Sequence, residues 1–332
     1  TNAFLNLGAL ADYGGPTLTH LPGAGSDAIG AIPNGTTISN NGTSWTCNDV
    51  DTFTDQRGES RPLNSGDDCT AGAVEMAPFC PTWTATTADE LYNCILEANA
   101  NESPSPTADT ITLGADIDLI TLTANPLPQI TSEITLEGAG YAIDGQDIVQ
   151  LFDVGSGGNF TVNQATLQNG SATDGGAIIN AGAVTVTNST FSSNSATGAG
   201  GAIATFSGAT LTVANSTFAS NAADPGGAIV NAGTATVSHS TFSANIAGGT
   251  GGGGIFNTGL ATVTNSTFSG NLVSGNGGGI LNFGTATVSQ STFSGNSAPN
   301  GGAINNLATL HLAGSIFGAG TSGANCFGTL ND

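Results

Sequence analysis

Short runs of alternating apolar and polar residues fill the second half of the chain. Segments 184–187 (VTVT) and 262–264 (TVT) are typical, with an apolar residue at every second position. Successive side chains of a strand point to opposite faces, so this alternation predicts strands that bury one face.

These strands recur with a fixed period. The triplet Ser-Thr-Phe returns in steps of 27, 24, 26, 25 and 24 residues, and its last copy is Ser-Ile-Phe. A second signature, Gly-Gly-(Ala/Gly)-Ile, recurs in step with it. Two motifs with one period indicate one structural unit repeated six times. The Phe residues of the first signature are Phe191, Phe218, Phe242, Phe268, Phe293 and Phe317.

The period and the strand pattern together predict an all-β fold, a right-handed parallel β-helix with about 25 residues per coil. Helical and leucine-rich repeats would need a 3.6-residue period or a Leu/Asn consensus, and neither is present. The right-handed rule for parallel crossovers gives the handedness. We place the β-helix at 111–332, after an irregular N-terminal β module at 1–78 and a linker with a short capping helix at 79–110.

Residues 88–100 (ADELYNCILEANA) are predicted to form this helix. Leu91, Cys94, Ile95 and Ala98 share one of its faces. The first coil would otherwise expose apolar residues and open strand edges that invite aggregation, so we expect the helix to cap it.

Two residue types define the predicted core of each coil. The Phe of Ser-Thr-Phe should point inward and stack on its neighbours in the next coils. The Asn three residues after each Phe is predicted to form an internal amide ladder, a structural role rather than a chemical one. These residues are Asn194, Asn221, Asn245, Asn271 and Asn296.

The Thr six residues before each Phe is expected to face outward. A regular row of outward Thr is typical of ice-binding solenoids, whereas solvated Thr of high strand propensity is the simpler interpretation. The mixed neighbouring row and the varying coil length count against a flat ice-binding lattice. The row contains Thr185, Thr212, Thr236, Thr262 and Thr287.

Composition and charge narrow the choice of partners. The chain has two Arg, no Lys and a net charge of -22, so it cannot build the basic patch that nucleic acid requires. No apolar run approaches the ~18 residues of a membrane span. Only three of the 24 acidic residues follow Asp153, and a nearly uncharged surface favours lateral association or a sugar coat.

Catalysis is not expected, and no cofactor is predicted. Glycoside hydrolysis needs paired carboxylates, and uronate lyases need a base together with cations. The repeats offer only isolated groups: Asp174, Asp224, His239 and His311. The early coils are the single candidate for an acidic cleft, with Asp116, Asp118, Asp144, Asp147 and Asp153.

One weak metal candidate precedes the coils. Asp49, Asp51 and Asp55 are spaced like the first ligands of a Ca²⁺ loop, but the Gly and Glu that complete an EF-hand are missing. We therefore predict no metal site.

The cysteines indicate an oxidising, extracellular location. Proximity alone pairs Cys47 with Cys69 and Cys80 with Cys94. Cys326 is left over, which suggests a free thiol or a bond to another molecule. Eight Asn-x-Ser/Thr sequons make glycans a further candidate partner.

A family resemblance adds to this interpretation. Residues 89–113 (DELYNCILEANANESPSPTADTITL), followed by ITLEGAGYAIDG and the GGAI and STFSxN units, resemble bacterial surface β-helix proteins with a CSLREA-type domain. These proteins are relatives of the polymorphic outer-membrane-protein repeats. Residues 7–76 resemble the choice-of-anchor module that follows the coils in those families. The resemblance implies an exported or cell-surface, non-catalytic protein.

The order of these parts is permuted, because here the anchor-like module comes before the coils. A module that completes the open end of a neighbour's β-helix would give head-to-tail contacts, and such contacts generate filaments. We therefore predict a structural subunit of an extracellular filament or surface fibre whose partners are copies of itself. The alternative is a monomeric adhesin or carbohydrate-binding protein, with ice binding third.

Overall fold

The computed structural model describes residues 7–11, 19–22, 37–40, 43–46, 80, 83–100, 109–119, 126–320, 322 and 324–328. The chain divides into two compact units, Thr1–Trp83 and Thr84–Asp332. In the first unit, β1 (Leu7–Ala11) pairs antiparallel with β2 (Thr19–Pro22), and β3 (Thr37–Asn40) pairs antiparallel with β4 (Thr43–Thr46).

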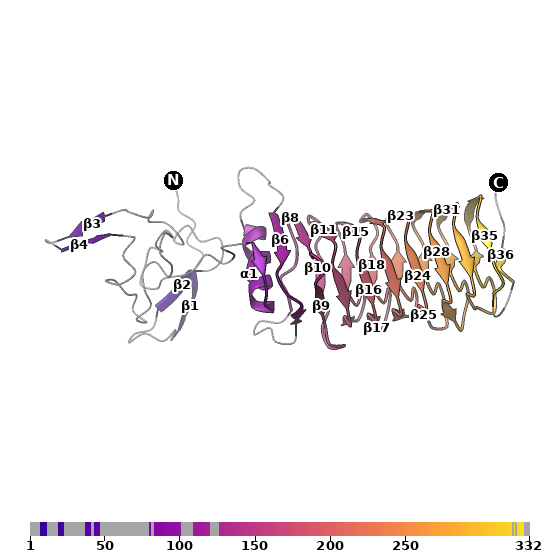
Figure 1. The fold of residues 1–332 in the computed structure, drawn as a ribbon, viewed down its shortest axis with the longest axis horizontal. Helices are drawn as coiled ribbons and strands as arrows, with labels where there is room; N and C mark the ends of the chain where they lie inside the picture. Colours follow the sequence, from indigo (N-terminus) through magenta and orange to yellow (C-terminus); the bar gives the residue numbers. More distant parts are fainter. Residues whose placement is uncertain are drawn as a thin grey trace. The chain divides into compact units, whose positions relative to one another are not determined.

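The second unit is a right-handed parallel β-solenoid of about nine coils with about 25 residues per coil. The predicted fold class is therefore confirmed. Figure 1 shows the strands of successive coils stacked side by side from β6 to β36, with helix α1 (Ala88–Ala100) at the N-terminal end of this stack. Three long parallel sheets and one short sheet run along the stack.

We name the sheets by the residues that characterise them. The Thr sheet contains β5 (Thr84–Ala85), β6 (Asp109–Leu113), β8 (Glu133–Glu137), β11 (Asn159–Asn163), β15 (Ala183–Thr187), β19 (Thr210–Ala214), β23 (Thr234–Ser238), β27 (Leu260–Thr264), β31 (Thr285–Ser289) and β34 (Thr309–Ala313). The Phe sheet contains β7 (Ile117–Asp118), β9 (Ala142–Asp144), β12 (Thr166–Gln168), β16 (Thr190–Ser192), β20 (Thr217–Ala219), β24 (Thr241–Ser243), β28 (Thr267–Ser269), β32 (Thr292–Ser294) and β35 (Ile316–Phe317).

The remaining two sheets follow in each coil. The short sheet contains β13 (Ser171–Ala172), β17 (Ser195–Ala196), β21 (Ala222–Ala223), β25 (Ile246–Ala247) and β29 (Leu272–Val273). The Ile sheet contains β10 (Phe152–Val154), β14 (Ile178–Asn180), β18 (Ile203–Thr205), β22 (Ile229–Asn231), β26 (Ile255–Asn257), β30 (Ile280–Asn282), β33 (Ile304–Asn306) and β36 (Cys326–Gly328).

A stack of Phe rings runs through the later coils. Neighbouring ring centroids from Phe191 to Phe293 lie 4.7 to 4.9 Å apart, and Phe293 and Phe317 lie 5.2 Å apart. The rings from Phe191 to Phe293 are fully buried. In-register parallel strands repeat every ~4.8 Å, so the backbone spacing itself places each ring on the next.

A buried amide ladder runs beside this stack. The Nδ2 of Asn221 donates to the Oδ1 of Asn245 at 2.9 Å, and the backbone N–H of Asn221 donates to the same oxygen at 3.0 Å. The Nδ2 also donates to the carbonyl oxygen of Phe191 at 3.1 Å. Equivalent amide-to-amide bonds join Asn194, Asn221, Asn245, Asn271 and Asn296 in one chain. Each amide is thus satisfied although it is fully buried.

A second amide ladder lies at the end of each strand of the Ile sheet. Asn231, Asn257, Asn282 and Asn306 are linked by Nδ2-to-Oδ1 bonds of 2.7 to 2.8 Å. Thr205 occupies the position between Asn180 and Asn231. Its hydroxyl is buried and has no hydrogen-bond partner, so the ladder is interrupted at this coil.

The Ser of Ser-Thr-Phe forms a third ladder that the sequence analysis did not predict. The hydroxyl of Ser216 donates to the carbonyl oxygen of Ala214 at 2.8 Å and accepts the backbone N–H of Ser189 at 3.2 Å. The same pattern continues at Ser240, Ser266 and Ser291. The constant Ser-to-Phe spacing was its signal in the sequence.

Coil length varies without disturbing the sheets. The spacing between the Asn ladder residue and the following Gly-Gly pair differs from coil to coil, and the turn Phe206–Gly208 adds two residues to one coil. The Gly-Gly pair itself is fixed by close backbone packing: Gly226 has a φ of +71°, and a Cβ at Gly227 would lie 2.5 Å from the carbonyl oxygen of Gly253. The Thr, Phe and Ile sheets therefore keep one register from coil to coil.

Helix α1 packs against β5, β6 and β8 of the first coils. Its predicted inner face, formed by Leu91, Cys94, Ile95 and Ala98, is at most 1% exposed. Thr87 precedes the helix and forms a capping box with Glu90, since the N–H of Glu90 donates to Thr87 Oγ1 and the N–H of Thr87 donates to Glu90 Oε2, both at 3.2 Å. The helix thus covers the N-terminal end of the solenoid.

Candidate functional site

The carboxylates of the early coils accept hydrogen bonds from loops and side chains of neighbouring coils. Asp118 and Asp144 are paired on consecutive coils, and Gln146 Nε2 donates to Asp118 Oδ2 at 3.2 Å. Asp116 accepts the N–H of Ala142, and Asp153 accepts Gln129 Nε2.

Asp144 accepts hydrogen bonds from three residues. It accepts the N–H of Gln146 at 2.8 Å, Gln168 Nε2 at 2.8 Å and Asn169 Nδ2 at 3.0 Å. Partial burial tends to raise the pKa of Asp144, but these hydrogen bonds outweigh it and lower the pKa below its ordinary value. A general acid at neutral pH requires the opposite shift.

The isolated groups of the repeats remain separate in the structure. Asp174 Oδ1 accepts the N–H of Ala199, and Asp224 accepts the N–H groups of Gly249 and Thr250, at 2.7 to 2.9 Å. Both carboxylates therefore cap loops of the following coil. His239 is exposed at the corner between the Thr and Phe sheets. His311 continues the outward Thr row and is also exposed.

No group of three or more His, Cys, Asp or Glu side chains that could hold a metal ion occurs among the described residues. Asp49, Asp51 and Asp55 lie outside those residues. Within the same part of the chain, no helix has the length and apolar character that a membrane span requires.

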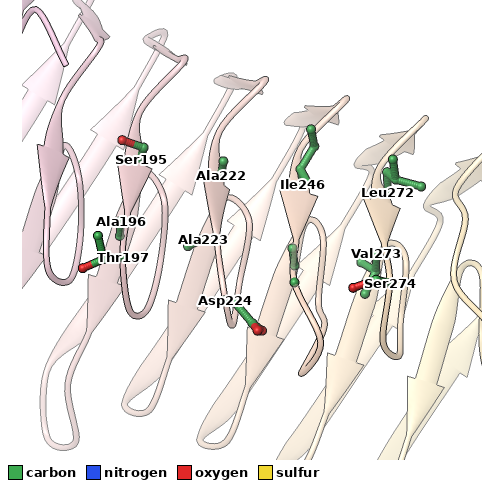
Figure 2. A pocket seen from close by; sticks show the side chains of 12 residues that line it. Ser195, Ala196, Thr197, Ala222, Ala223, Asp224, Ile246, Leu272, Val273 and Ser274 are labelled. Carbon is green, nitrogen blue, oxygen red and sulfur yellow. The ribbon is translucent and has the colours of Figure 1, made fainter.

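A shallow groove runs along the short sheet. It has a volume of about 620 Å³ and crosses four consecutive coils. Figure 2 shows Ser195, Ala222, Ile246 and Leu272 following one another along these coils. Ile246 and Leu272 are 50% and 51% exposed. The floor is formed by the small apolar residues Ala196, Ala223, Ala247 and Val273.

The groove offers little for a charged or sugar ligand. Asp224 is its one charged lining residue, and its two carboxylate oxygens already accept N–H groups of the next coil. No aromatic ring lines it, whereas sugar-binding sites commonly use rings for stacking. The arrangement can bury small apolar side chains from a partner surface.

Outward-facing Phe residues form a second apolar surface that the sequence analysis missed. Phe256 lies at the outward position of β26, and its ring centroid is 5.7 Å from that of Phe283. Phe283 directly follows β30 and is 48% exposed. The sequence did contain a signal for Phe256, since the residue after the inward Ile of each Gly-Gly-x-Ile must point outward.

The outward Thr row stays in register along the whole Thr sheet. Its members pair coil by coil without a bulge, from Thr110 to Thr287, and His311 follows them. The variation in coil length therefore does not break the register of this row, while the flatness of its lattice stays untested. The neighbouring row is mixed, as expected, with Thr187, Ala214, Ser238, Thr264 and Ser289.

The C-terminal end of the solenoid carries the free cysteine. Cys326 pairs in register with Ile304, so it continues the inward Ile row of the Ile sheet. The thiol is half-buried, and this burial raises its pKa. Cys80 and Cys94 are both disulfide-bonded. Cys47 and Cys69 lie outside the described residues, so the predicted pairing of the four stays a prediction.

Comparisons with known proteins agree with this architecture. Residues 147–298 match the family model of the right handed beta helix region. Residues 290–307 match the Chlamydia polymorphic membrane protein repeat. No curated protein and no solved structure matches the chain. The resemblance to CSLREA-type and choice-of-anchor modules stays a prediction, while the two matches indicate a surface-exposed β-helix protein.

Proposed function

We propose that the protein is a non-catalytic structural subunit of an extracellular filament or surface fibre. The strand edges and the exposed apolar side chains of the last described coil carry this proposal. Helix α1 covers the N-terminal end, whereas β34, β35 and β36 are the last strands of their sheets, with no further described strand beside them. Such edges are templates for pairing with another chain.

The side chains at this end are suited to burial by a further coil. Phe317 ends the ring stack, and Ile316 and Phe327 are 66% and 49% exposed. A neighbour's N-terminal module that docks here would cover these apolar groups and give a head-to-tail contact. Because that contact does not close on itself, repetition produces a filament. Cys326 is the candidate for a covalent link across it.

Negative-stain electron microscopy of the full chain tests this proposal, with and without reductant and beside a non-reducing gel. Filaments with an axial repeat near one subunit length are expected, and covalent multimers on the gel would assign Cys326 to the contact. Phe317→Asp should abolish the filaments, because it places a charge where rings must stack. Phe206→Asp, the same change at an exposed Phe far from either end, should leave them intact.

Single rods at every concentration would refute head-to-tail assembly. The same filaments from the Phe317→Asp variant as from the wild type would refute it as well. Thermal unfolding of each variant verifies that the coils remain folded. No observation favours the adhesin alternative, which required an acidic or aromatic groove.

Ice binding is a second candidate function, favoured by one observation, the unbroken register of the outward Thr row. Thr side chains at the regular coil spacing of ~4.8 Å form a periodic surface. Thermal hysteresis of the full chain would support this function, and its complete absence would exclude it.

A further inference from the structure

The short-sheet groove and the corner that follows the Ile sheet both carry exposed apolar side chains, and both repeat with the coils. We define the groove row as Ala222, Ile246 and Leu272, and the corner row as Thr258, Phe283 and Leu307. We propose that the groove row of one copy receives the corner row of a second copy, so that two solenoids associate side by side. This proposal does not depend on head-to-tail assembly.

The groove row is rigidly positioned. The N–H groups of Ala222, Ile246 and Leu272 donate to the carbonyl oxygens of Asn194, Asn221 and Asn245, each at 2.9 Å. These acceptors belong to the buried amide ladder. The backbone at Ile246 and Leu272 is therefore held in register on consecutive coils, and both side chains are half-exposed.

The corner row is held in the same way on another side of the solenoid. The N–H groups of Thr258, Phe283 and Leu307 donate to the carbonyl oxygens of Asn231, Asn257 and Asn282, each at 2.8 Å. Phe283 and Leu307 are 48% and 50% exposed. The Phe256 ring beneath Phe283 supports it from one coil before. Exposed apolar rows of this kind on a surface mark an interaction site.

The repeat distance selects a second solenoid as the occupant. Both rows step by the spacing of parallel strands, ~4.8 Å. An extended peptide presents side chains on one face only every ~6.8 Å, which is out of step with the groove. A row of stacked side chains from another copy stays in step over all three coils.

Charge also favours a second copy. Between Gly175 and Gly320, Asp224 is the only residue of the types Asp, Glu, Lys and Arg. Two such surfaces approach each other without the repulsion that a net charge of -22 would otherwise cause. A charged partner would find no complementary group in either row.

Analytical ultracentrifugation of the full chain with two reciprocal variants tests the proposal. Leu272→Asp damages the groove row and Phe283→Asp damages the corner row. Each should weaken self-association by at least about tenfold, because burial of an unpaired charge costs more than the ~1.4 kcal/mol that corresponds to a factor of ten. Phe206→Asp, a change at the equivalent corner position three coils earlier, is the matched control and should associate like the wild type.

Mixing the two variants gives the sharper result. Each retains the row that the other has lost, so an equimolar mixture should form one-to-one pairs that neither variant forms alone. The proposal would be overturned if the wild-type chain forms no lateral pairs at any concentration. The groove would then be left to a different occupant, such as an extended peptide. A mixture that does not pair would overturn the proposal as well. Head-to-tail contacts would be unaffected by these side-surface changes, so end-to-end filaments and lateral pairs are distinguishable by width in electron micrographs.

Discussion

Buried polar side chains stabilise this solenoid because each one is shared between coils. Asn245 accepts two hydrogen bonds from Asn221 and donates to Asn271 and to the carbonyl oxygen of Phe218. A buried amide that lost these partners would carry a desolvation cost. The ladder therefore fixes the register that the apolar stack alone would allow to slip.

We expect Asn245→Ala to lower the free energy of unfolding by about 2 to 4 kcal/mol, because it leaves buried groups on two neighbouring coils unpaired. Chemical denaturation monitored by circular dichroism measures this change. Asn300→Ala removes an exposed amide and should change stability by less than about 0.5 kcal/mol. Equal losses in both variants would contradict the structural role of the ladder.

A substitution at Thr205 should not destabilise the protein in the way that Asn245→Ala does. Since the Thr205 hydroxyl is buried without a partner, Thr205→Val removes an unsatisfied group at nearly constant volume. We expect no loss, or a gain of up to about 1 kcal/mol, in the free energy of unfolding. Ser216→Ala removes a hydroxyl with two partners and should destabilise the protein. A more stable Ser216→Ala variant would refute this account.

At the scale of the elements, the capping box of α1 couples the N-terminal end of the solenoid to pH. Hydrogen bonds from Thr86, then from Thr87, lower the pKa of Glu90 below its ordinary value of 4.5, against the raising effect of partial burial. A carboxyl with a lowered folded-state pKa adds stability above its unfolded pKa, and this contribution disappears as the pH falls through the folded value.

Glu90→Gln should therefore unfold at a lower temperature than the wild type at neutral pH. The difference between their melting temperatures should shrink as the pH falls below 4.5, because protonated Glu90 resembles Gln. Thermal melts over this pH range check the prediction. A difference that stays constant down to strongly acidic pH would contradict it.

The sequence predicted the elements that follow from periodicity. Alternation and the fixed step of Ser-Thr-Phe gave the strands, the coil length and the inward Phe, because stacking converts one repeated pattern into one repeated geometry. The capping helix followed from a face of four apolar residues. The outward Phe256 and Phe283 were not predicted, because most other coils have a different residue at these positions, which therefore carry no repeated signal.

The groove could not have been predicted in this way. Its concavity arises where Ala222 gives way to Ile246 and Leu272 on successive coils, and the sequence shows only a variable position after the ladder Asn.

At the scale of the whole molecule, the two halves of the chain differ in charge. Acidic residues are concentrated before Asp153, and the later coils are almost uncharged. Helix α1 packs on the first of the described coils, and the coils run in one direction away from it. A head-to-tail assembly of such subunits would therefore be polar along its axis.

Cys326 lies on β36, the last described strand, and can report on whether a neighbour covers it. Its raised pKa keeps the thiol protonated at neutral pH, and the thiol form reacts slowly. We expect a disulfide reagent to label Cys326 more slowly than it labels the same chain in denaturant at the same pH. Labelling of Cys326 should be slower still in assembled material if a neighbour covers this strand. Equal labelling rates in assembled and dispersed samples would show that no neighbour covers Cys326.

The loop before each Gly-Gly pair also makes the solenoid a scaffold for display. It tolerates differences in length in natural coils while the Thr, Phe and Ile sheets keep their register. Foreign peptides inserted there on successive coils would emerge from one edge at intervals of ~4.8 Å. The protein could thus present a dense, evenly spaced array of epitopes on a support whose core never meets the insert.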